Sequence, residues 1–419
     1  MSLSGALSSA ITGLTAQSQA LAMVSDNLAN ASTTGYKTNT GMFDDLVTGA
    51  TNASEYSSGG VNVYTRQNIT QQGLLTTTTN STDVAIEGSG FFQVSSALSG
   101  GQISYTRNGA FTPDNEGYLV NQGSYLMGYR TDANGVASGD MVPIDTNVQE
   151  IDRAPTTKSA LQLNLPSDAA AGATFSTSIP VYDSLGAANT VEVTWTKSST
   201  ADTWTATFAN PTATDNPSGG PTGVVSGGPI TVTFNADGSL DATSPSPPTI
   251  GVTGWKDGAA NSSIALDFGT AGGTNGLTQY NSGETTPDIA ITAVNSDGLP
   301  YGKLSSISIG SNGLVNATYS NGHTIPIYEI PVATFAAPDQ LQAESNGLYQ
   351  ATIGSGTPTL LASGKQGAGT IFGSELESSA TNTNSEFSTM MTAQQAYSAS
   401  AQVVTAVNKM FDTLISAMR

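Results

Sequence analysis

The chain has 419 residues, one histidine, no cysteine, and a formal charge of −20 from 12 basic and 32 acidic side chains. So few basic residues cannot neutralise a run of phosphates, which argues against a nucleic-acid or anionic-membrane partner. The lack of cysteine excludes disulfides and thiolate chemistry, and the single His323 excludes a multi-histidine metal centre. The length predicts two or three domains of roughly 100 to 200 residues.

The N-terminal segment is predicted to form an amphipathic helix that ends near Asn30. Its apolar residues recur at alternating spacings of three and four, which is the pattern of a coiled-coil seam. Asp26 is the only charged side chain in the first 36 residues. Because a solvent-facing helix usually carries Glu and Lys, we expect this helix to meet other protein. The predicted N-terminal seam consists of Leu3, Leu7, Ala10, Leu14, Leu21, Val24 and Leu28, with Gln17 as a polar member.

The C-terminal segment repeats this spacing up to the end of the chain. An amphipathic helix more often packs onto its own globular core, by roughly two to one. Both helices lie at the extremities and carry little charge, so we expect them to pair as a coiled coil and to order against copies of themselves. The predicted C-terminal seam consists of Phe387, Met390, Tyr397, Ala401, Val404, Phe411, Ile415 and Met418, with Gln394 and Asn408 as polar members.

The segment from about Gly60 to Gly373 is predicted to consist of strands and turns. Residues 191–197 and 203–208 alternate branched or aromatic residues with polar ones, which predicts an antiparallel hairpin that contains Trp195 and Trp204. We expect long loops at 211–229 and 244–248. The predicted class is mainly β with two terminal helices. Further strands are expected within 110–120, 229–241, 303–322 and 324–335.

Few residues suggest chemistry. Residues 132–135 and 235–241 superficially resemble calcium loops, but neither has the glutamate of an EF-hand, and Asx-Gly turns explain them at roughly nine to one. His323 follows an Asn-Gly turn, which favours a surface or packing role. Gly88-Ser89-Gly90 is a turn and not a phosphate loop, because no lysine or helix follows it. We therefore expect no catalytic residues, no bound metal and no cofactor.

Three segments resemble the signatures of the bacterial flagellar rod and hook axial protein family. They span 26–37, 83–94 and 105–129. The segments 181–197 and 296–322, together with the length, are similar to the hook members of that family, and the resemblance covers 1–419 but thins between about 209 and 280. The motif residues that match are Asn27, Asn30, Thr33, Gly35, Tyr36, Lys37, Gly88, Gly90, Phe91 and Phe92.

The resemblance implies a structural subunit that polymerises into a curved, flexible tube, the universal joint between the motor and rod and the filament. The implied partners are copies of itself, the rod, hook cap and hook–filament junction proteins, and the type III export apparatus, with no nucleic acid and no membrane insertion. The implied location is the extracellular hook, reached by export without a cleaved signal peptide, as expected from an N-terminus that lacks a basic segment.

The resemblance also implies three domains. Residues 1–71 and 363–419 would form a helical inner domain with its connecting segment, 72–152 and 285–362 a middle antiparallel β domain, and 153–284 an outer antiparallel β domain inserted into it. One departure from the family pattern is residues 380–383, where an Asn-Val-Asp-Leu segment is absent; Asn384 or Ser385 is then the expected N-cap of the last helix.

Other protein classes remain open. A distal rod subunit shares the terminal motifs but is typically shorter. A secreted β-rich adhesin shares the acidic, Thr-rich composition but does not need paired terminal heptads, and a secreted hydrolase would need a carboxylate pair that spacing along the chain does not reveal.

Overall fold

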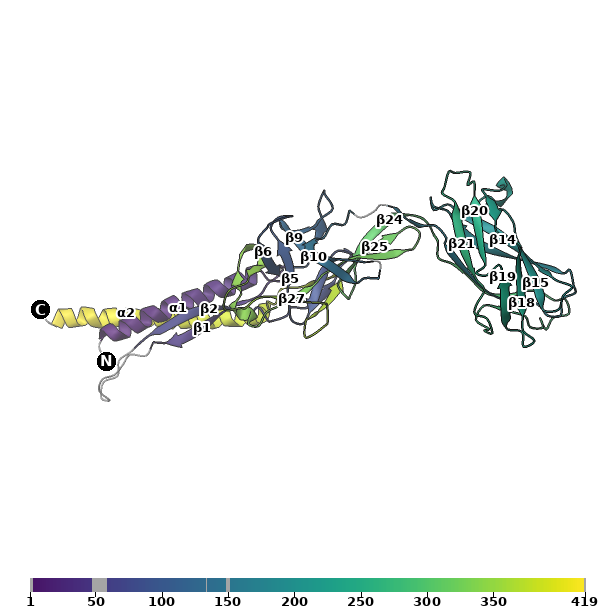
Figure 1. The fold of residues 1–419 in the computed structure, drawn as a ribbon. Coiled ribbons are helices and arrows are strands. Elements are labelled where there is room, and N and C mark those ends of the chain that lie inside the picture. The colour runs from purple at the N-terminus through teal and green to yellow at the C-terminus, as the bar shows by residue number, and fades with distance from the viewer. Residues whose placement is uncertain (1–2, 47–58, 133, 148–150, 418–419) are drawn as a thin grey trace. The chain divides into compact units, whose positions relative to one another are not determined.

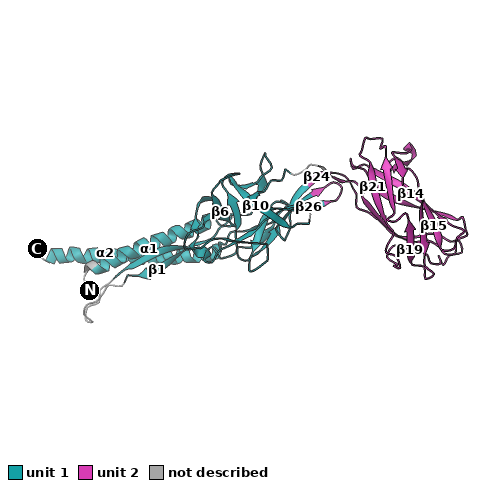
Figure 2. Ribbon diagram, viewed as in Figure 1, with its two compact units in different colours: residues 1–148, 306–317, 324–419 teal, residues 149–305, 318–323 magenta. Residues whose placement is uncertain are grey.

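The computed structural model describes residues 3–46, 59–132, 134–147 and 151–417 (Figure 1). The chain forms two compact units (Figure 2). Unit 1 comprises residues 1–148, 306–317 and 324–419, and unit 2 comprises residues 149–305 and 318–323. In the described residues, neither helix is both long and apolar enough to cross a lipid bilayer.

The two helices, α1 (Leu3–Ala29) and α2 (Thr383–Ala417), pack side by side in unit 1 (Figure 1). They run antiparallel, because Asn27 at the end of α1 bonds Glu386 at the start of α2, while Gly13 lies opposite Ser400. A Cβ atom on Gly13 would stand 3.4 Å from the Ser400 hydroxyl, so the helices approach closely here. The expected pairing of the terminal helices is confirmed.

A two-stranded ribbon accompanies α1. Strands β1 (Asn39–Asp45) and β2 (Val61–Gln67) pair antiparallel and both contact α1. A Cβ atom on Gly41 would meet the Met23 methyl group at 2.8 Å, so the absence of a side chain lets β1 lie on the helix. Strand β1 was not predicted, since strands were expected only from about Gly60. Its seven residues carry little β-branched character, and β2 is the partner that fixes it.

The remaining strands of unit 1 surround two apolar clusters. One cluster centres on Phe92, Phe111 and Leu126, and the other on Phe91, Tyr105 and Tyr349. The strands that lie wholly in unit 1, besides β1 and β2, are β3 (Leu75–Thr77), β4 (Val84–Glu87), β5 (Phe92–Ser95), β6 (Ile103–Thr106), β7 (Thr112–Pro113), β8 (Leu119–Asn121), β9 (Ser124–Thr131), β10 (Ala137–Pro143), β26 (Thr324–Glu329), β27 (Val332–Thr334), β28 (Gln342–Ala343), β29 (Leu348–Gln350), β30 (Thr359–Leu361), β31 (Thr370–Gly373) and β32 (Glu375–Glu377).

Within unit 1, the main sheet places β26, β9, β5, β6, β29 and β28 side by side, with antiparallel pairing throughout. Two shorter pairs bring the chain ends together: β4 pairs with β31, and β3 pairs with β32. The residues that follow α1 and those that precede α2 therefore belong to the same unit. Strands β24 (Leu299–Ile309) and β25 (Leu314–Tyr319) are divided between the two units.

Unit 2 consists of strands and their connections, which include one 3-10 turn at Pro217–Gly219. Two sheets enclose one apolar cluster that contains Trp195, Trp204 and Trp255. The first sheet has the order β13-β14-β15-β18-β19, and the second has the order β17-β20-β21-β12-β22. The strands of this unit are β11 (Ile151–Ala154), β12 (Lys158–Asn164), β13 (Thr174–Tyr182), β14 (Ala188–Lys197), β15 (Thr203–Phe208), β16 (Thr212–Ala213), β17 (Val224–Ser226), β18 (Ile230–Phe234), β19 (Leu240–Ser244), β20 (Thr249–Thr253), β21 (Ser262–Asp267), β22 (Leu277–Thr278) and β23 (Ala290–Ser296).

The predicted hairpin is confirmed by the pairing of β14 with β15, and the buried Trp195 and Trp204 face the core. Two expectations need correction. The segment 211–229 contains β16 and β17, because these short strands find partners in β14 and β20. The sheets are also not purely antiparallel, since β12 runs parallel to β21 and β22. Strand β12 is joined to both by long connections, and parallel neighbours require such connections.

The domain limits expected from the sequence and the compact units differ in extent. The outer part was expected to span 153–284, whereas unit 2 extends from 149 to 305 and also includes 318–323. The additional residues include β23, which pairs with β12, and part of β24, which pairs with β11. Strand pairing thus draws residues beyond 284 into unit 2.

We predict that Trp204→Ala lowers the free energy of unfolding of unit 2 by about 3–5 kcal/mol, since it leaves a cavity in the core. The substitution also removes the indole NH that donates a hydrogen bond to Gln279 Oε1 at 2.9 Å. Urea unfolding followed by circular dichroism measures the loss. The exposed Thr207→Ala on the same strand is the control and should change stability by no more than about 0.5 kcal/mol; equal losses in the two variants would contradict the prediction.

Candidate assembly site at the base of the terminal helices

The matching segment 26–37, called the first motif below, holds the end of α1 to the start of α2. Asn27 is buried, and its amide both donates to the Asn39 carbonyl and accepts from the Asn39 NH, each at 2.8 Å. It also donates to Glu386 and accepts from the Tyr36 hydroxyl, both at 3.2 Å. The Thr381 hydroxyl donates to the Asn27 carbonyl. One side chain therefore joins α1, the turn after it and α2.

The turn that follows α1 is fixed by its own side chains. The Asn30 amide donates to the Asp26 carbonyl at 2.9 Å, and the Thr33 hydroxyl donates to Asn30 at 3.1 Å. Gly35 adopts φ +68°, and a Cβ atom there would lie 2.9 Å from the Arg107 carbonyl carbon. Only glycine meets both conditions without strain. The sharp turn directs Lys37 inward.

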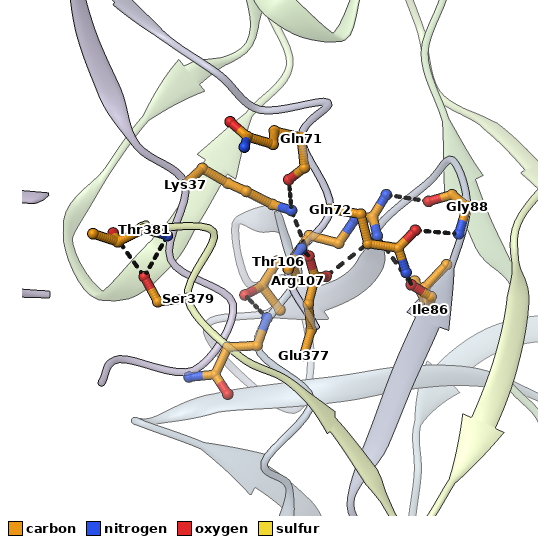
Figure 3. Close-up of polar contacts among 12 residues, drawn as sticks. Lys37, Gln71, Gln72, Ile86, Gly88, Thr106, Arg107, Glu377, Ser379 and Thr381 are labelled. Carbon is orange, nitrogen blue, oxygen red and sulfur yellow. Dashed lines mark hydrogen bonds and ion pairs between the residues drawn. The ribbon is translucent and has the colours of Figure 1, made fainter. Parts of the chain in front are cut away.

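Lys37 ends in a buried cluster of charges (Figure 3). Its Nζ lies 2.6 Å from Glu377 Oε1 and donates to the Gln71 carbonyl. The same Oε1 accepts from the Gly73 NH at 2.7 Å, while Arg107 Nη1 lies 3.4 Å from Glu377 Oε2. All three charged side chains are almost fully buried. We call Lys37, Arg107 and Glu377 the buried charge cluster.

Arg107 extends the cluster to the matching segment 83–94, called the second motif below. Its Nη2 donates to the Gly88 carbonyl at 2.6 Å and its Nη1 donates to the Ile86 carbonyl at 3.2 Å. Its guanidinium stands 5.3 Å from the centre of the Phe91 ring. Among the described residues its buried Nε has no hydrogen-bond partner. The cluster depends all the more on Glu377, because that carboxylate is the counter-charge for two buried cations.

Burial sets the electrostatics of this cluster. Loss of water lowers the pKa of Lys37 and of Arg107, and the Glu377 carboxylate acts in the opposite direction on both. The lowered pKa values mean that desolvation outweighs the attraction to Glu377. Without Glu377 the two cations would keep only main-chain carbonyl acceptors, and buried charges without a counter-charge are strongly destabilising.

The second motif shapes the surroundings of Arg107. Gly88 and Gly90 both have positive φ, and a Cβ atom on Gly90 would collide with Val332. This turn sends the next two aromatic side chains into different cores. Phe91 packs against Phe335 and Tyr349, and Phe92 packs edge-on against Phe111. The motif therefore joins the two apolar clusters of unit 1.

The described N-terminal seam residues lie on the covered face of α1. Ala10 and Val24 are buried, whereas Leu7, Leu14, Leu21 and Leu28 are half-buried. Leu3 begins the helix, and its side chain lies outside the described set. The fully buried face of α1 also includes residues that the seam did not contain, namely Ala16, Ala20, Met23 and Asn27. Their burial reflects contact with two neighbours, α2 and the β1–β2 ribbon.

The C-terminal seam residues divide into two groups. Met390, Ala401, Val404 and Phe411 are half-buried, and Ala393 and Val407 are the buried residues of α2. The predicted seam members Phe387, Tyr397 and Ile415 are exposed. Met418 lies outside the described residues. The seam therefore carries more apolar surface than α1 covers.

Two functional residues were not predicted. Arg107 lay within a matching segment but carried no predicted role, and Glu377 was not singled out at all. The lone Lys37 in a polar stretch was the only indication that a distant carboxylate was required. The expected N-cap was wrong: α2 begins at Thr383, and Asn382 is the cap because its Oδ1 accepts from the NH groups of Asn384 and Ser385.

The two segments that resemble calcium loops form turns, and His323 forms a surface contact. Asp132 Oδ1 accepts from the NH groups of Asn134 and Val136, and Asp237 Oδ1 accepts from that of Ser239, so both are Asx turns. His323 Nδ1 lies 2.7 Å from Asp152 Oδ2 at the surface of unit 2. In the described parts of the chain no three His, Asp or Glu side chains are grouped to hold a metal.

We predict that Glu377→Gln destabilises unit 1 by about 3–5 kcal/mol, because Lys37 and Arg107 are then buried without a counter-charge. Thermal and urea unfolding measure the effect. Glu375→Gln on the same strand is the matched control, for which we expect a change of no more than about 0.5 kcal/mol. If the Glu377→Gln variant were as stable as this control, the cluster would not hold the base together.

Four family models match successive parts of the chain. The flagella basal body rod protein model matches 7–37, the flagellar hook protein FlgE/F/G D1 domain matches 85–170, the flagellar basal body protein FlaE D2 domain matches 145–299, and the flagellar basal body rod FlgEFG protein C-terminal model matches 374–417. The models that match 7–37 and 374–417 include Lys37 and Glu377, which meet at the base of the two helices.

Relatives match over the full length. The flagellar hook protein of Rhizobium meliloti (strain 1021) is 33% identical over 100% of both chains, and that of Brucella abortus biovar 1 is 32% identical over 100% of both. The crystal structure of a Helicobacter pylori flagellar hook protein has the same fold, with a TM-score of 0.53 at 14% identity, over 72% of this chain and 100% of that one. The chain therefore belongs to the flagellar hook protein family.

Proposed function

We propose that this chain, as a structural subunit of the flagellar hook, polymerises through its terminal helices into a curved, flexible tube. The observation that carries this proposal is the apolar surface that α2 leaves exposed. Met391 is 59% exposed, Leu414 54% and Ile415 59%, although α1 packs against the same helix. The other large apolar side chains that α2 exposes are Phe387, Tyr397, Val403 and Met410.

An exposed apolar set of this size on a single helix is typical of a surface that other protein covers. In a polymer, helices from neighbouring copies would bury it. The seam residues predicted in α1 and α2 would then have two functions, some in pairing the helices of one chain and others in contacts between chains. Met390 and Val404 fit the first function, and Ile415 fits the second.

The low charge of the helices fits an inner wall. Asp26 is the only charged side chain of α1, and α2 carries only Glu386, Lys409 and Asp412. A channel that conducts unfolded chains should present neither strong charge nor continuous apolar patches toward its lumen. We propose that the polar Ser, Thr and Gln side chains of these helices line such a channel.

We further propose that the β parts form two nested domains, a middle domain of 72–152 with 285–362 and an outer domain of 153–284. The pairing of β9 with β26 and of β6 with β29 joins 72–152 to 285–362 and supports the nesting. A universal joint bends while its subunits slide at their outer contacts. Small polar surface residues suit this sliding, because wet and individually weak contacts break and remake readily.

The proposal includes the route and the partners of the chain. The subunit would be exported by the type III apparatus without a cleaved signal peptide and would act outside the cell. There it would contact the rod, the hook cap and the hook–filament junction proteins. Its function is mechanical, and we assign it no catalytic residue, no cofactor and no nucleic-acid partner.

We predict that Met410→Gln/Leu414→Gln abolishes polymerisation and motility while the subunit stays folded, because both side chains are exposed in the single chain. Electron microscopy of concentrated protein and swarming of a complemented strain measure the two outcomes, and circular dichroism checks the fold. Thr392→Gln, an exposed polar position of α2, is the control and should assemble normally. Curved tubes formed by the double variant would refute the role of this surface.

A further inference from the structure

A cavity of about 510 Å³ lies in unit 2, which contains neither the helices nor the buried charge cluster. It is lined by residues from the turn between β13 and β14, from the segment after β16 and from the segment after β20. Three aspartates, Asp183, Asp215 and Asp257, line it together with Trp255 and Lys256.

Asp183 is the most constrained of these groups. Only 1% of its surface is exposed. Its Oδ1 accepts from the NH groups of Leu185 and Ala187, both at 2.9 Å, which fixes the carboxylate in an Asx turn. Its Oδ2 is buried and has no hydrogen-bond donor among the described residues. A buried carboxylate oxygen without a donor is costly and indicates a missing partner.

The neighbour of Asp183 is a second carboxylate and not a donor. Asp257 lines the same cavity as Asp183, and Asp257 Oδ1 accepts from the Ala259 NH at 3.1 Å. Burial raises the pKa of Asp183, and the contact with Asp257 raises it further. When both groups are ionised, acceptor faces acceptor and like charges repel. A cation placed between them would remove both difficulties.

The two loops that carry these carboxylates are held in position without any ligand. The Ala260 NH donates to the Ser184 hydroxyl at 2.8 Å, which joins the loop after β13 to the loop after β20. The Lys256 NH donates to the Thr222 carbonyl at 2.8 Å, and the Thr222 hydroxyl donates to Asn189 at 2.6 Å. The carboxylate pair is therefore preorganised.

We propose that Asp183 and Asp257 bind one divalent cation of the calcium class at the wall of this cavity. Hard cations take oxygen ligands, and calcium accepts a flexible set of six to eight that includes carboxylates, main-chain carbonyls and water. The pair supplies two carboxylates, and the cavity has room for the waters that complete the shell. Lys256 also lines this cavity.

A bound ion would fasten the β13–β14 turn to the segment after β20. These belong to different sheets of unit 2, so the ion would join the two sheets. Extracellular calcium sites of low affinity have dissociation constants of about 10⁻⁴–10⁻³ M, and we expect this site to fall in that range. The inference concerns unit 2 alone and stands whether or not the chain polymerises.

The test uses the full chain after treatment with a chelator. Isothermal titration with calcium chloride should give about one ion per chain, and the melting temperature of unit 2 should rise with calcium. Asp257→Asn should bind at least about tenfold more weakly. Without calcium this variant should melt no lower than the unchanged protein, because the new amide can donate to Asp183 Oδ2.

Asp237→Asn is the matched control, since Asp237 also forms an Asx turn in unit 2 but lies outside the cavity. It should keep the full calcium response. Two results would overturn the proposal. One is an equal response to calcium in the Asp257→Asn variant and the unchanged protein. The other is no response at millimolar calcium together with a rise in melting temperature on acidification, which would mean that the carboxylates share a proton.

Discussion

The structure of unit 1 depends on one carboxylate. Glu377 neutralises Lys37, which follows the turn after α1, and Arg107, which follows β6. It also accepts a hydrogen bond from the Gly73 NH. A buried ion pair offsets the cost of its desolvation only when its geometry is good and further hydrogen bonds satisfy the remaining donors and acceptors. Each segment that reaches Glu377 is therefore fixed in position as well as attached. The helix base inherits this geometry, since Tyr36 immediately precedes Lys37 and its hydroxyl donates to Asn27.

The helices contrast with this rigid base. Their contact relies on small residues such as Gly13 and Ala10, which permit close approach but bury little apolar area each. Much of the larger apolar surface of α2 is left exposed. The helix pair is held to the β structure by the hydrogen bonds of Asn27, but α2 leaves apolar side chains exposed along its whole length, from Phe387 to Ile415. The division suits a subunit whose order is completed by its neighbours.

Sequence patterns predicted what depends on local periodicity. The hairpin that carries Trp195 and Trp204 and the two terminal helices follow from alternation and heptad spacing, and both are confirmed. The buried charge cluster could not be predicted, because Lys37 and Glu377 are 340 positions apart and the spacing carries no information about their contact. Strand β1 was missed for a similar reason. It is held in place by its pairing with β2 and by the close approach of Gly41 to Met23, and its own sequence pattern shows neither contact. The cap at Asn382 depended on where α2 begins, and boundaries are the least certain feature of a pattern.

The distance along the chain between Lys37 and Glu377 also sets an order of events. A ribosome delivers the N-terminal residues first, and Lys37 and Arg107 emerge long before their counter-charge is made. Until then neither cation can enter a dry interior without a large penalty, so the base stays open and hydrated. Closure waits for the final tenth of the chain. The fold is thus built to remain unlocked through most of its own synthesis.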